Sequence, residues 1–312
     1  MEWYWIVLLI AGVLVLIALA LGYAFFRYLC DDNRKAGENL DNGEGRALKA
    51  YVPVIKSKAK QIAAYKHEVV STKSFDGLTL RAKLYPNKKT GRIVILVHGY
   101  HSSSAWDFGA SFEMYYREGY TILAVDDRAH GGSEGKYIGF GALDQRDVRS
   151  WMDWTVQRFG KDCRIAIIGV SMGAATVMLT TGNYPIPQLA CAIEDCGYTS
   201  ISDVVDYLIR LRHVPAFPLR QLASLWSKWL AGYWFSETSA EEAVKQSHTP
   251  TLFIHGTADK FVEFYMLDRV YNACAAPKQK VVFEDAVHGE SSYKYPERFE
   301  KTVIPFLQTY MS

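Results

Sequence analysis

The feature that most constrains the fold of this chain is an alternation of short apolar runs with amphipathic segments from residue 67 onward. The apolar runs are rich in Val and Ile, which is typical of strands buried on both faces of a sheet. They lie at 67–73, 78–85, 92–97, 121–125, 164–170, 189–193, 251–255 and 280–283. The first two runs predict a hairpin across Asp76-Gly77, because that dipeptide favours a tight turn.

Helical patterns fill the intervals between the later strands. They lie at 105–118, 144–159, 172–181, 240–246, 263–273 and 296–310. A hairpin followed by repeated strand–helix units predicts an α/β protein with a mostly parallel, doubly wound sheet. In such sheets the active site lies at the carboxyl ends of the strands.

One region, residues 198–239, interrupts this alternation, and we interpret it as a helical cap inserted over the site. It is rich in aromatic side chains, namely Trp226, Trp229, Tyr233, Trp234 and Phe235. Because such side chains more often fill a core than contact a ligand, we expect them to be core residues of the cap.

The N-terminus carries 24 residues without a charge, from Trp3 to Phe26. At about 1.5 Å per residue this run exceeds the roughly 30 Å hydrocarbon core of a bilayer. Aromatic residues at both ends resemble the interfacial belts of membrane proteins. A cleaved secretory signal is the alternative, but the run is too long and no basic segment precedes it. We therefore predict a retained transmembrane anchor over residues 1–29, with residues 3–26 in the membrane.

Basic residues follow this span and none precedes it, which by the positive-inside rule places the remainder of the chain in the cytoplasm. They are Arg27, Arg34, Lys35, Arg46 and Lys49. Residues 30–64 are expected to form a linker, flexible at 41–45, and a basic juxtamembrane segment. The helix-prone stretch 46–66 either lies on anionic lipid headgroups or packs on the catalytic domain, predicted at 65–312. Pro53 argues against one straight helix there.

Composition excludes some classes of function and partner. A net charge of +2 and the lack of any zinc-finger or arginine-rich pattern argue against nucleic acid as a partner. The five cysteines are too few and too irregular for a disulfide framework, so we expect buried free thiols. Cys191 and Cys196 are the alternative as a metal or disulfide pair, but no second pair of ligands follows at suitable spacing.

The sequence Gly169-Val170-Ser171-Met172-Gly173 lies between an apolar run and a predicted helix. A serine in such a cramped turn needs small residues two before and two after it, so that the backbones can pass. The turn raises the hydroxyl above the sheet, near a helix N-terminus that favours developing negative charge. Ser171 is therefore the predicted nucleophile.

A serine hydroxyl needs a base, and the base needs a carboxylate that orients it. His288 follows the last predicted strand and is the only histidine after Asp259. Asp259 follows the strand at 251–255 and is the predicted acid. Asp195 ends the preceding strand and is the alternative acid, its other role being to hold the cap loop through Asx-type hydrogen bonds.

An oxyanion hole requires two backbone N–H groups. We assign one to Met172, directly after the nucleophile, and the other to Tyr100 in the loop after the strand at 92–97. Gly99 lets that backbone approach the reacting centre. His98 and His101 lie in the same loop, and without a third ligand nearby we expect structural roles for both.

These motifs, in this order, resemble the α/β-hydrolase superfamily, and within it the serine aminopeptidase-like and monoacylglycerol lipase-like group. The segment 126–135 is similar to that group's D-x-R-G-H-G-x-S-x-G loop, and 195–200 to its D-x-x-Y-x-S segment. The resemblance spans about 65–310 and implies the α/β-hydrolase fold. Ala129 replaces the usual glycine of that loop, and Glu263 stands where the group often has proline.

The predicted chemistry is acyl transfer to water, with no metal or organic cofactor. A carboxylic ester is the preferred substrate, because an alkoxide leaves more readily than an amide nitrogen. The anchor and the aromatic cap are compatible with a lipid-like ester, and equally with an anchor that only sets location. An amidase or aminopeptidase is the nearest alternative, and a non-catalytic membrane-bound scaffold of the same fold is a weaker one.

Overall fold

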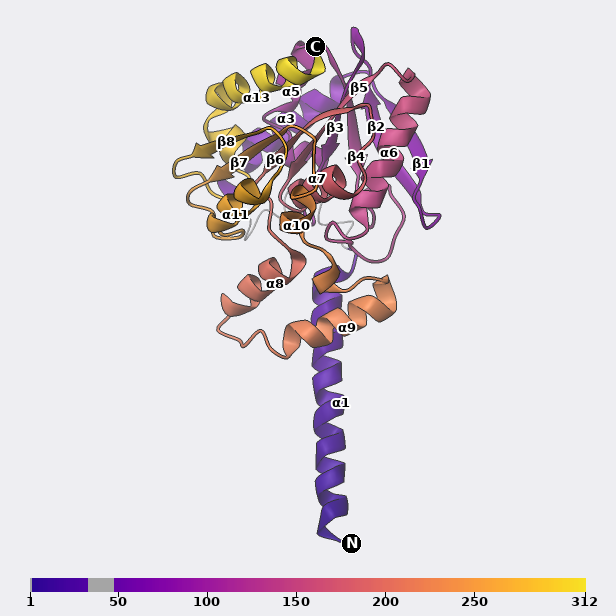
Figure 1. Ribbon diagram of the computed structural model, residues 1–312, viewed down its shortest axis with the longest axis vertical. Helices are drawn as coiled ribbons and strands as arrows, with labels where there is room; N and C mark the ends of the chain where they lie inside the picture. Colours follow the sequence, from indigo (N-terminus) through magenta and orange to yellow (C-terminus); the bar gives the residue numbers. More distant parts are fainter. Residues whose placement is uncertain (1, 33–47) are drawn as a thin grey trace.

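The computed structural model describes residues 2–32 and 48–312, and its centre is an eight-stranded sheet. The strand order is β1-β2-β4-β3-β5-β6-β7-β8 (Figure 1). β2 pairs antiparallel with both β1 and β4, and all other neighbours are parallel. The strands are β1 Glu68–Lys73, β2 Thr79–Tyr85, β3 Lys89–Val97, β4 Tyr120–Asp126, β5 Arg164–Val170, β6 Leu189–Asp195, β7 Thr251–Gly256 and β8 Lys278–Phe283. The predicted mostly parallel α/β sheet is confirmed.

Helices cover both faces of this sheet, as the runs of Val and Ile predict. Val94 and Ile168 point to one face and share a buried cluster with residues of α3, α5 and α13. Ile95 and Ile167 point to the other face and pack with residues of α6 and α7. The bounds are α3 Val52–Ala64, α5 Phe112–Arg117, α6 Asp144–Phe159, α7 Met172–Asn183, α10 Ala240–Val244, α11 Tyr265–Ala273, α12 Ser291–Lys294 and α13 Pro296–Met311.

The helix predicted over 105–118 is instead two short helices, α4 Ser104–Asp107 and α5. The Tyr293 hydroxyl donates to the carbonyl of Trp106 at 2.7 Å. A continuous helix would use that carbonyl for the amide four residues later, so a contact from a distant part of the chain accompanies the break.

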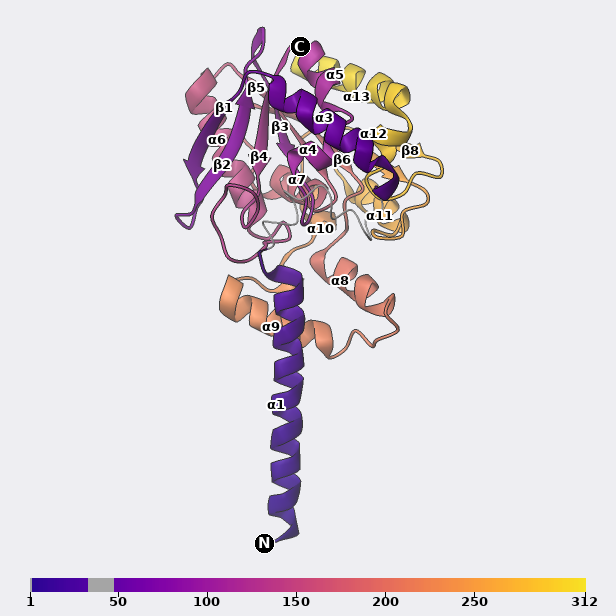
Figure 2. The same cartoon turned by 180° about the vertical axis from the view of Figure 1, so that it is seen from behind.

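The basic stretch 46–66 packs on the domain, which is one of its two predicted alternatives. A turn of 3₁₀ helix, η1 Lys49–Tyr51, leads into α3, and Pro53 lies in the first turn of α3, where its missing N–H is tolerated. Ile55 and Ile62 are buried, and α3 crosses the back of the domain (Figure 2). The predicted flexible linker at 41–45, with Arg34, Lys35 and Arg46, lies outside the described residues.

The insertion 198–239 forms the predicted helical cap from α8 Ile201–Arg210, α9 Leu219–Ala231 and the 3₁₀ turn η2 Phe235–Glu237. Tyr233 and Phe235 are buried in a cluster that reaches the domain. Trp229, by contrast, is largely exposed. The prediction that the cap aromatics fill a core therefore holds for the first two and is wrong for Trp229.

The N-terminal apolar run is a single helix, α1 Trp3–Cys30, that projects from the domain (Figures 1 and 2). Within residues 2–32 and 48–312 it is the one helix long and apolar enough to cross a membrane, a test that a signal sequence also passes. Its last turns, with Phe26, Leu29 and Cys30, are buried in the domain. All five cysteines are free and buried, as predicted.

Candidate active site

Ser171 lies in a sharp turn between β5 and α7, with φ 56° and ψ −115°. Non-glycine residues rarely adopt a positive φ, so this backbone is strained. The Ser171 N–H donates to the carbonyl of Asp195 at 2.9 Å. A Cβ added at Gly169 would lie 2.6 Å from the Ala174 nitrogen, and one added at Gly173 would lie 2.7 Å from the carbonyl carbon of Val97. Both glycines therefore allow β3, β5 and α7 to pass closely enough to form the turn.

His288 and Asp259 come from the loops after β8 and β7, so both lie at carboxyl ends of strands. His288 Nε2 lies 2.8 Å from Ser171 Oγ, and His288 Nδ1 lies 2.7 Å from Asp259 Oδ2. An imidazole that donates Nδ1–H to a carboxylate leaves Nε2 free to accept a proton from the serine. The structure brings the predicted nucleophile, base and acid into one chain of hydrogen bonds.

The carboxylate of Asp259 is buried but well supplied with donors. Its Oδ1 accepts the N–H groups of Phe261 at 2.8 Å and Val262 at 2.9 Å, and its Oδ2 also accepts from His255 Nε2 at 3.1 Å. Burial alone would raise the pKa of Asp259, but His288 and His255 outweigh it and hold that pKa well below its usual value. Asp259 is therefore ionised at neutral pH.

His255 is a partner of Asp259 that the sequence did not reveal. Its Nε2–H is shared between Asp259 Oδ2 and the carbonyl of Val262, the latter at 3.2 Å. The spacing His255-Gly256-Thr257-Ala258-Asp259 is the only available signal, because it places the histidine at the last turn of β7 before the acid.

The environment of His288 favours its protonated form. Burial lowers the pKa of His288, but the charge and hydrogen bond of Asp259 more than offset this, so that the pKa is raised above 6.5. The Cys196 thiol, Asp259 and His288 place potential metal-ligand atoms within 4.8 Å of one another. Because Asp259 and His288 already bond to each other and to Ser171, the arrangement is better suited to proton transfer than to metal binding.

The alternative acid, Asp195, is placed differently. Its Oδ1 accepts from the Ser291 hydroxyl at 3.3 Å, whereas the described hydrogen bond to His288 Nδ1 comes from Asp259. Burial raises the pKa of Asp195 to about 7. The turn-stabilising role considered for Asp195 belongs to Glu194, whose Oε2 accepts the Gly197 N–H at 2.9 Å.

The loop after β3 runs directly beside the candidate nucleophile. A Cβ added at Gly99 would lie 3.2 Å from Ser171 Cβ, which places the Gly99–Tyr100 backbone next to the reacting centre. Met172 is the first residue of α7, where amides have no acceptor within the helix. The Gly99 N–H donates to Asp107 Oδ2 at 2.6 Å, so Asp107 holds the loop in place. No motif marks Asp107, because its contact depends on how α4 folds back.

The other residues of this loop contact backbone and neighbouring rings. His98 Nε2 accepts the Asp127 N–H at 3.1 Å, and its Nδ1 donates to the Gly99 carbonyl at 2.9 Å. The ring of His101 stacks on Tyr100 with centroids 3.9 Å apart. The Tyr100 hydroxyl donates to the carbonyl of Leu29 at 2.9 Å, which ties the loop to the end of α1.

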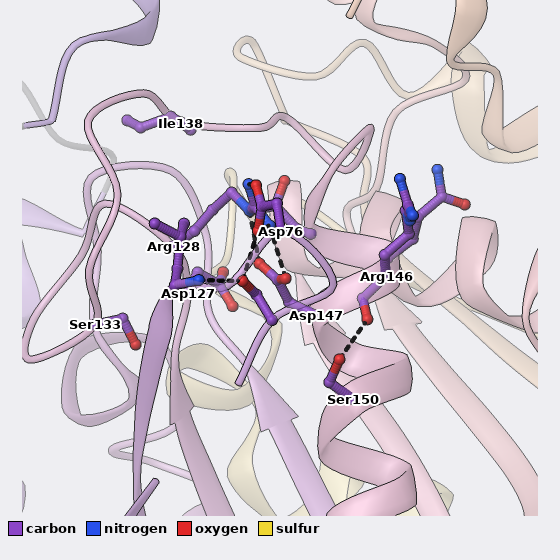
Figure 3. A network of polar contacts seen from close by, with 12 residues as sticks. Asp76, Asp127, Arg128, Ser133, Ile138, Arg146, Asp147 and Ser150 are labelled. Carbon is purple, nitrogen blue, oxygen red and sulfur yellow. Dashed lines mark hydrogen bonds and ion pairs between the residues drawn. The ribbon is translucent and has the colours of Figure 1, made fainter. Parts of the chain in front are cut away.

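The segment 126–135 is held by a buried cation rather than by the site. Arg128 Nε lies 2.6 Å from Asp147 Oδ2 on α6, and its NH1 lies 3.0 Å from Asp76 Oδ2 in the β1–β2 hairpin (Figure 3). Ala129 has φ 61°, so it adopts the backbone that glycine favours at the corresponding position of the similar motif. This loop therefore joins the hairpin, β4 and α6.

Comparison with known proteins assigns the chain to a family. A family model described as the alpha/beta hydrolase family matches residues 94–301, and the chain belongs to this family. The uncharacterized protein YqkD of Bacillus subtilis (strain 168) is 25% identical over 307 residues, which cover 96% of each chain.

Two solved structures have the same architecture. The Pyrococcus furiosus esterase Pf2001 has a TM-score of 0.67 at 23% identity, covering 81% of this chain and 96% of that one. The Pyrococcus horikoshii acylaminoacyl peptidase has a TM-score of 0.60 at 16% identity, covering 81% and 43%. These likenesses confirm the predicted α/β-hydrolase fold, and the family supports a hydrolase activity.

Proposed function

We propose that this protein is a serine hydrolase that cleaves carboxylic esters through an acyl-enzyme intermediate. The observation that carries the proposal is the unbroken chain from Ser171 Oγ to His288 Nε2 at 2.8 Å and from His288 Nδ1 to Asp259 Oδ2 at 2.7 Å. Both distances are those of hydrogen bonds that can move a proton from the serine to the imidazole.

In the proposed reaction Ser171 Oγ attacks the acyl carbon while its proton passes to His288 Nε2. Asp259 stays ionised, as its lowered pKa requires, and stabilises the imidazolium. The amides of Tyr100 and Met172 hold the oxyanion. His288 then gives the proton to the leaving alcohol, and water repeats the sequence to release the acid and restore Ser171.

The experiment is hydrolysis of a short-chain p-nitrophenyl ester by the full chain in detergent. The Ser171→Ala variant is expected to lose measurable turnover, whereas Ser150→Ala is expected to keep it. Ser150 is a matched control because its hydroxyl bonds only a carbonyl of its own helix, at Arg146 (Figure 3). A wild type without turnover on esters of any chain length, or full turnover in Ser171→Ala, would overturn the proposal.

An amidase or aminopeptidase with the same residues is the second candidate. It is favoured by the similar architecture of the acylaminoacyl peptidase, which shows only that this fold supports amide cleavage. Paired substrates with one acyl group, an ester and an anilide, separate the two. We expect the ester to be cleaved faster, and a preference for the anilide would reverse the assignment.

We also propose that α1 is a retained membrane anchor and that the domain faces the cytoplasm. A cleaved signal would remove Phe26, Leu29 and Cys30, which are buried in the domain. Arg27 follows the apolar run, and no basic residue precedes it. Mass spectrometry of the mature N-terminus tests retention. Protease treatment of spheroplasts and of inverted vesicles tests sidedness, and digestion of the domain in intact spheroplasts would contradict the proposed orientation.

A further inference from the structure

The cap presents a group of apolar side chains to the outside of the molecule. We call this group the cap face, and it consists of Leu211, Val214, Phe217, Leu225, Trp229 and Leu230. Phe217 is 73% exposed and Trp229 is 74% exposed. Contiguous apolar surface of this kind is unusual on a soluble monomer and marks an interaction site.

The cap face points away from the catalytic domain. Ala223, Ser224 and Ser227 are the buried residues of α9. At about 100° of rotation per residue, Leu225 and Trp229 lie on the opposite side of the helix. α9 crosses α1 between the domain and the projecting part of α1 in both views, so this side faces the direction in which α1 projects (Figures 1 and 2).

α1 and α9 are in firm contact, so the position of one fixes the position of the other. Gly22 packs on Leu222, and a Cβ added at Gly22 would lie 3.1 Å from the Leu222 carbonyl carbon. Trp226 Nε1 donates to the carbonyl of Leu19 at 3.0 Å, and its ring lies 5.0 Å from that of Tyr23. The cap is therefore attached to the apolar helix and is not a freely moving lid.

The depth of this contact matches a membrane interface. Leu19 and Tyr23 lie about 24 and 30 Å along the helix from Trp3, at 1.5 Å per residue. That range is the far boundary of a roughly 30 Å hydrocarbon core. Trp and Tyr side chains are enriched at this boundary, and Trp229 would lie there beside Tyr23.

Cations stand at the same end of α1. Arg212 donates to the Tyr28 hydroxyl at 2.9 Å, Arg27 lies one residue before it, and the side chain of Arg210 is 71% exposed. An apolar face with basic residues at its edge is the arrangement of helices that lie in the plane of a membrane surface.

We propose that the cap face is a membrane-contact surface, embedded in the headgroup region of the phospholipid bilayer that α1 spans. Its opposite side packs in the same cluster as Met172, with Tyr100 against it, so the cap lies between the bilayer and the candidate site. The proposal depends on α1 being a membrane span and does not depend on the hydrolytic reaction.

The test attaches an environment-sensitive fluorophore to single introduced cysteines in the full chain, reconstituted in vesicles of phosphatidylcholine and phosphatidylglycerol. The native cysteines are buried, so the labelled wild type gives the background. Trp229→Cys reports on the cap face. Leu14→Cys, at a 61% exposed position of α1, is the lipid control, and Val69→Cys, at a 63% exposed position of β1, is the aqueous control.

We expect the label at position 229 to show a blue-shifted emission and loss of intensity with a nitroxide carried on the lipid headgroup. The label at 14 should also be quenched by nitroxide lipids, and the label at 69 only by aqueous iodide. Iodide quenching at 229 with lipid quenching at 14 would overturn the cap proposal while leaving the anchor intact. Iodide quenching at 14 would overturn both. Neither result bears on the ester reaction, which the Ser171→Ala comparison tests separately.

Discussion

Replacing Asp259 by Asn changes the protonation of the site while leaving its shape nearly intact. The Asn side-chain oxygen can still accept the Phe261 and Val262 amides, now at 2.8 and 2.9 Å. Its NH₂ group then replaces the oxygen that lies 2.7 Å from His288 Nδ1. Two donors cannot share that contact, so His288 must move its proton to Nε2, where it can no longer accept the proton of Ser171.

The expected loss follows from this change of tautomer. A wrong tautomer in a Ser-His-Asp arrangement lowers kcat by about 10³–10⁴-fold, or about 4–5.5 kcal/mol of transition-state stabilisation. The assay is kcat/KM for the p-nitrophenyl ester, with circular dichroism on the same samples to show that the variant is folded.

Asp195→Asn is the matched control for this experiment. Asp195 is also buried and acidic, but its carboxylate bonds Ser291 at 3.3 Å. We expect less than about a tenfold loss of kcat/KM, since one neutral hydrogen bond contributes about 1 kcal/mol. Equal losses in the two variants, or a larger loss in Asp195→Asn, would refute the assignment of Asp259 as the acid.

Three further outcomes are expected. Because His288 must be neutral to accept a proton and its pKa is raised, kcat/KM should fall as the pH decreases through a midpoint above 6.5; a midpoint below 6.5 would contradict the effect of Asp259. Gly169→Ala should lower the free energy of unfolding by about 1–3 kcal/mol in denaturant titration, because its Cβ would collide with the start of α7; unchanged stability would refute the close approach. Arg128→Met should lower that free energy by about 3–5 kcal/mol, because it leaves Asp147 buried without its cation, and a loss below about 1 kcal/mol would count against the network in Figure 3.

The parts of the fold that follow from local pattern could be predicted from the sequence. Residues of β3 and β5 such as Ile95 and Ile167 alternate with Val94 and Ile168 between two buried faces, so the runs themselves signal the sheet. The turn at Ser171 is likewise a local consequence of two flanking glycines. Its convergence with His288 and Asp259 was expected from the shared strand ends.

The rest depends on contacts between distant segments. The break between α4 and α5 involves Tyr293, almost two hundred residues away in the chain. The support that Asp107 gives to Gly99, and the donation of His255 to Asp259, arise only once loops fold together. The exposure of Trp229 was mispredicted because composition does not reveal that one side of α9 faces outward.

The most direct test of the central claim is to find which atom reacts with an electrophile that mimics the acyl group. A fluorophosphonate should phosphonylate the folded wild-type chain, and peptide mass spectrometry should place the adduct on Ser171. His288→Ala should reduce the rate of labelling sharply, because the serine then lacks its base. An adduct on another residue, or no adduct on folded protein, would contradict the proposed nucleophile.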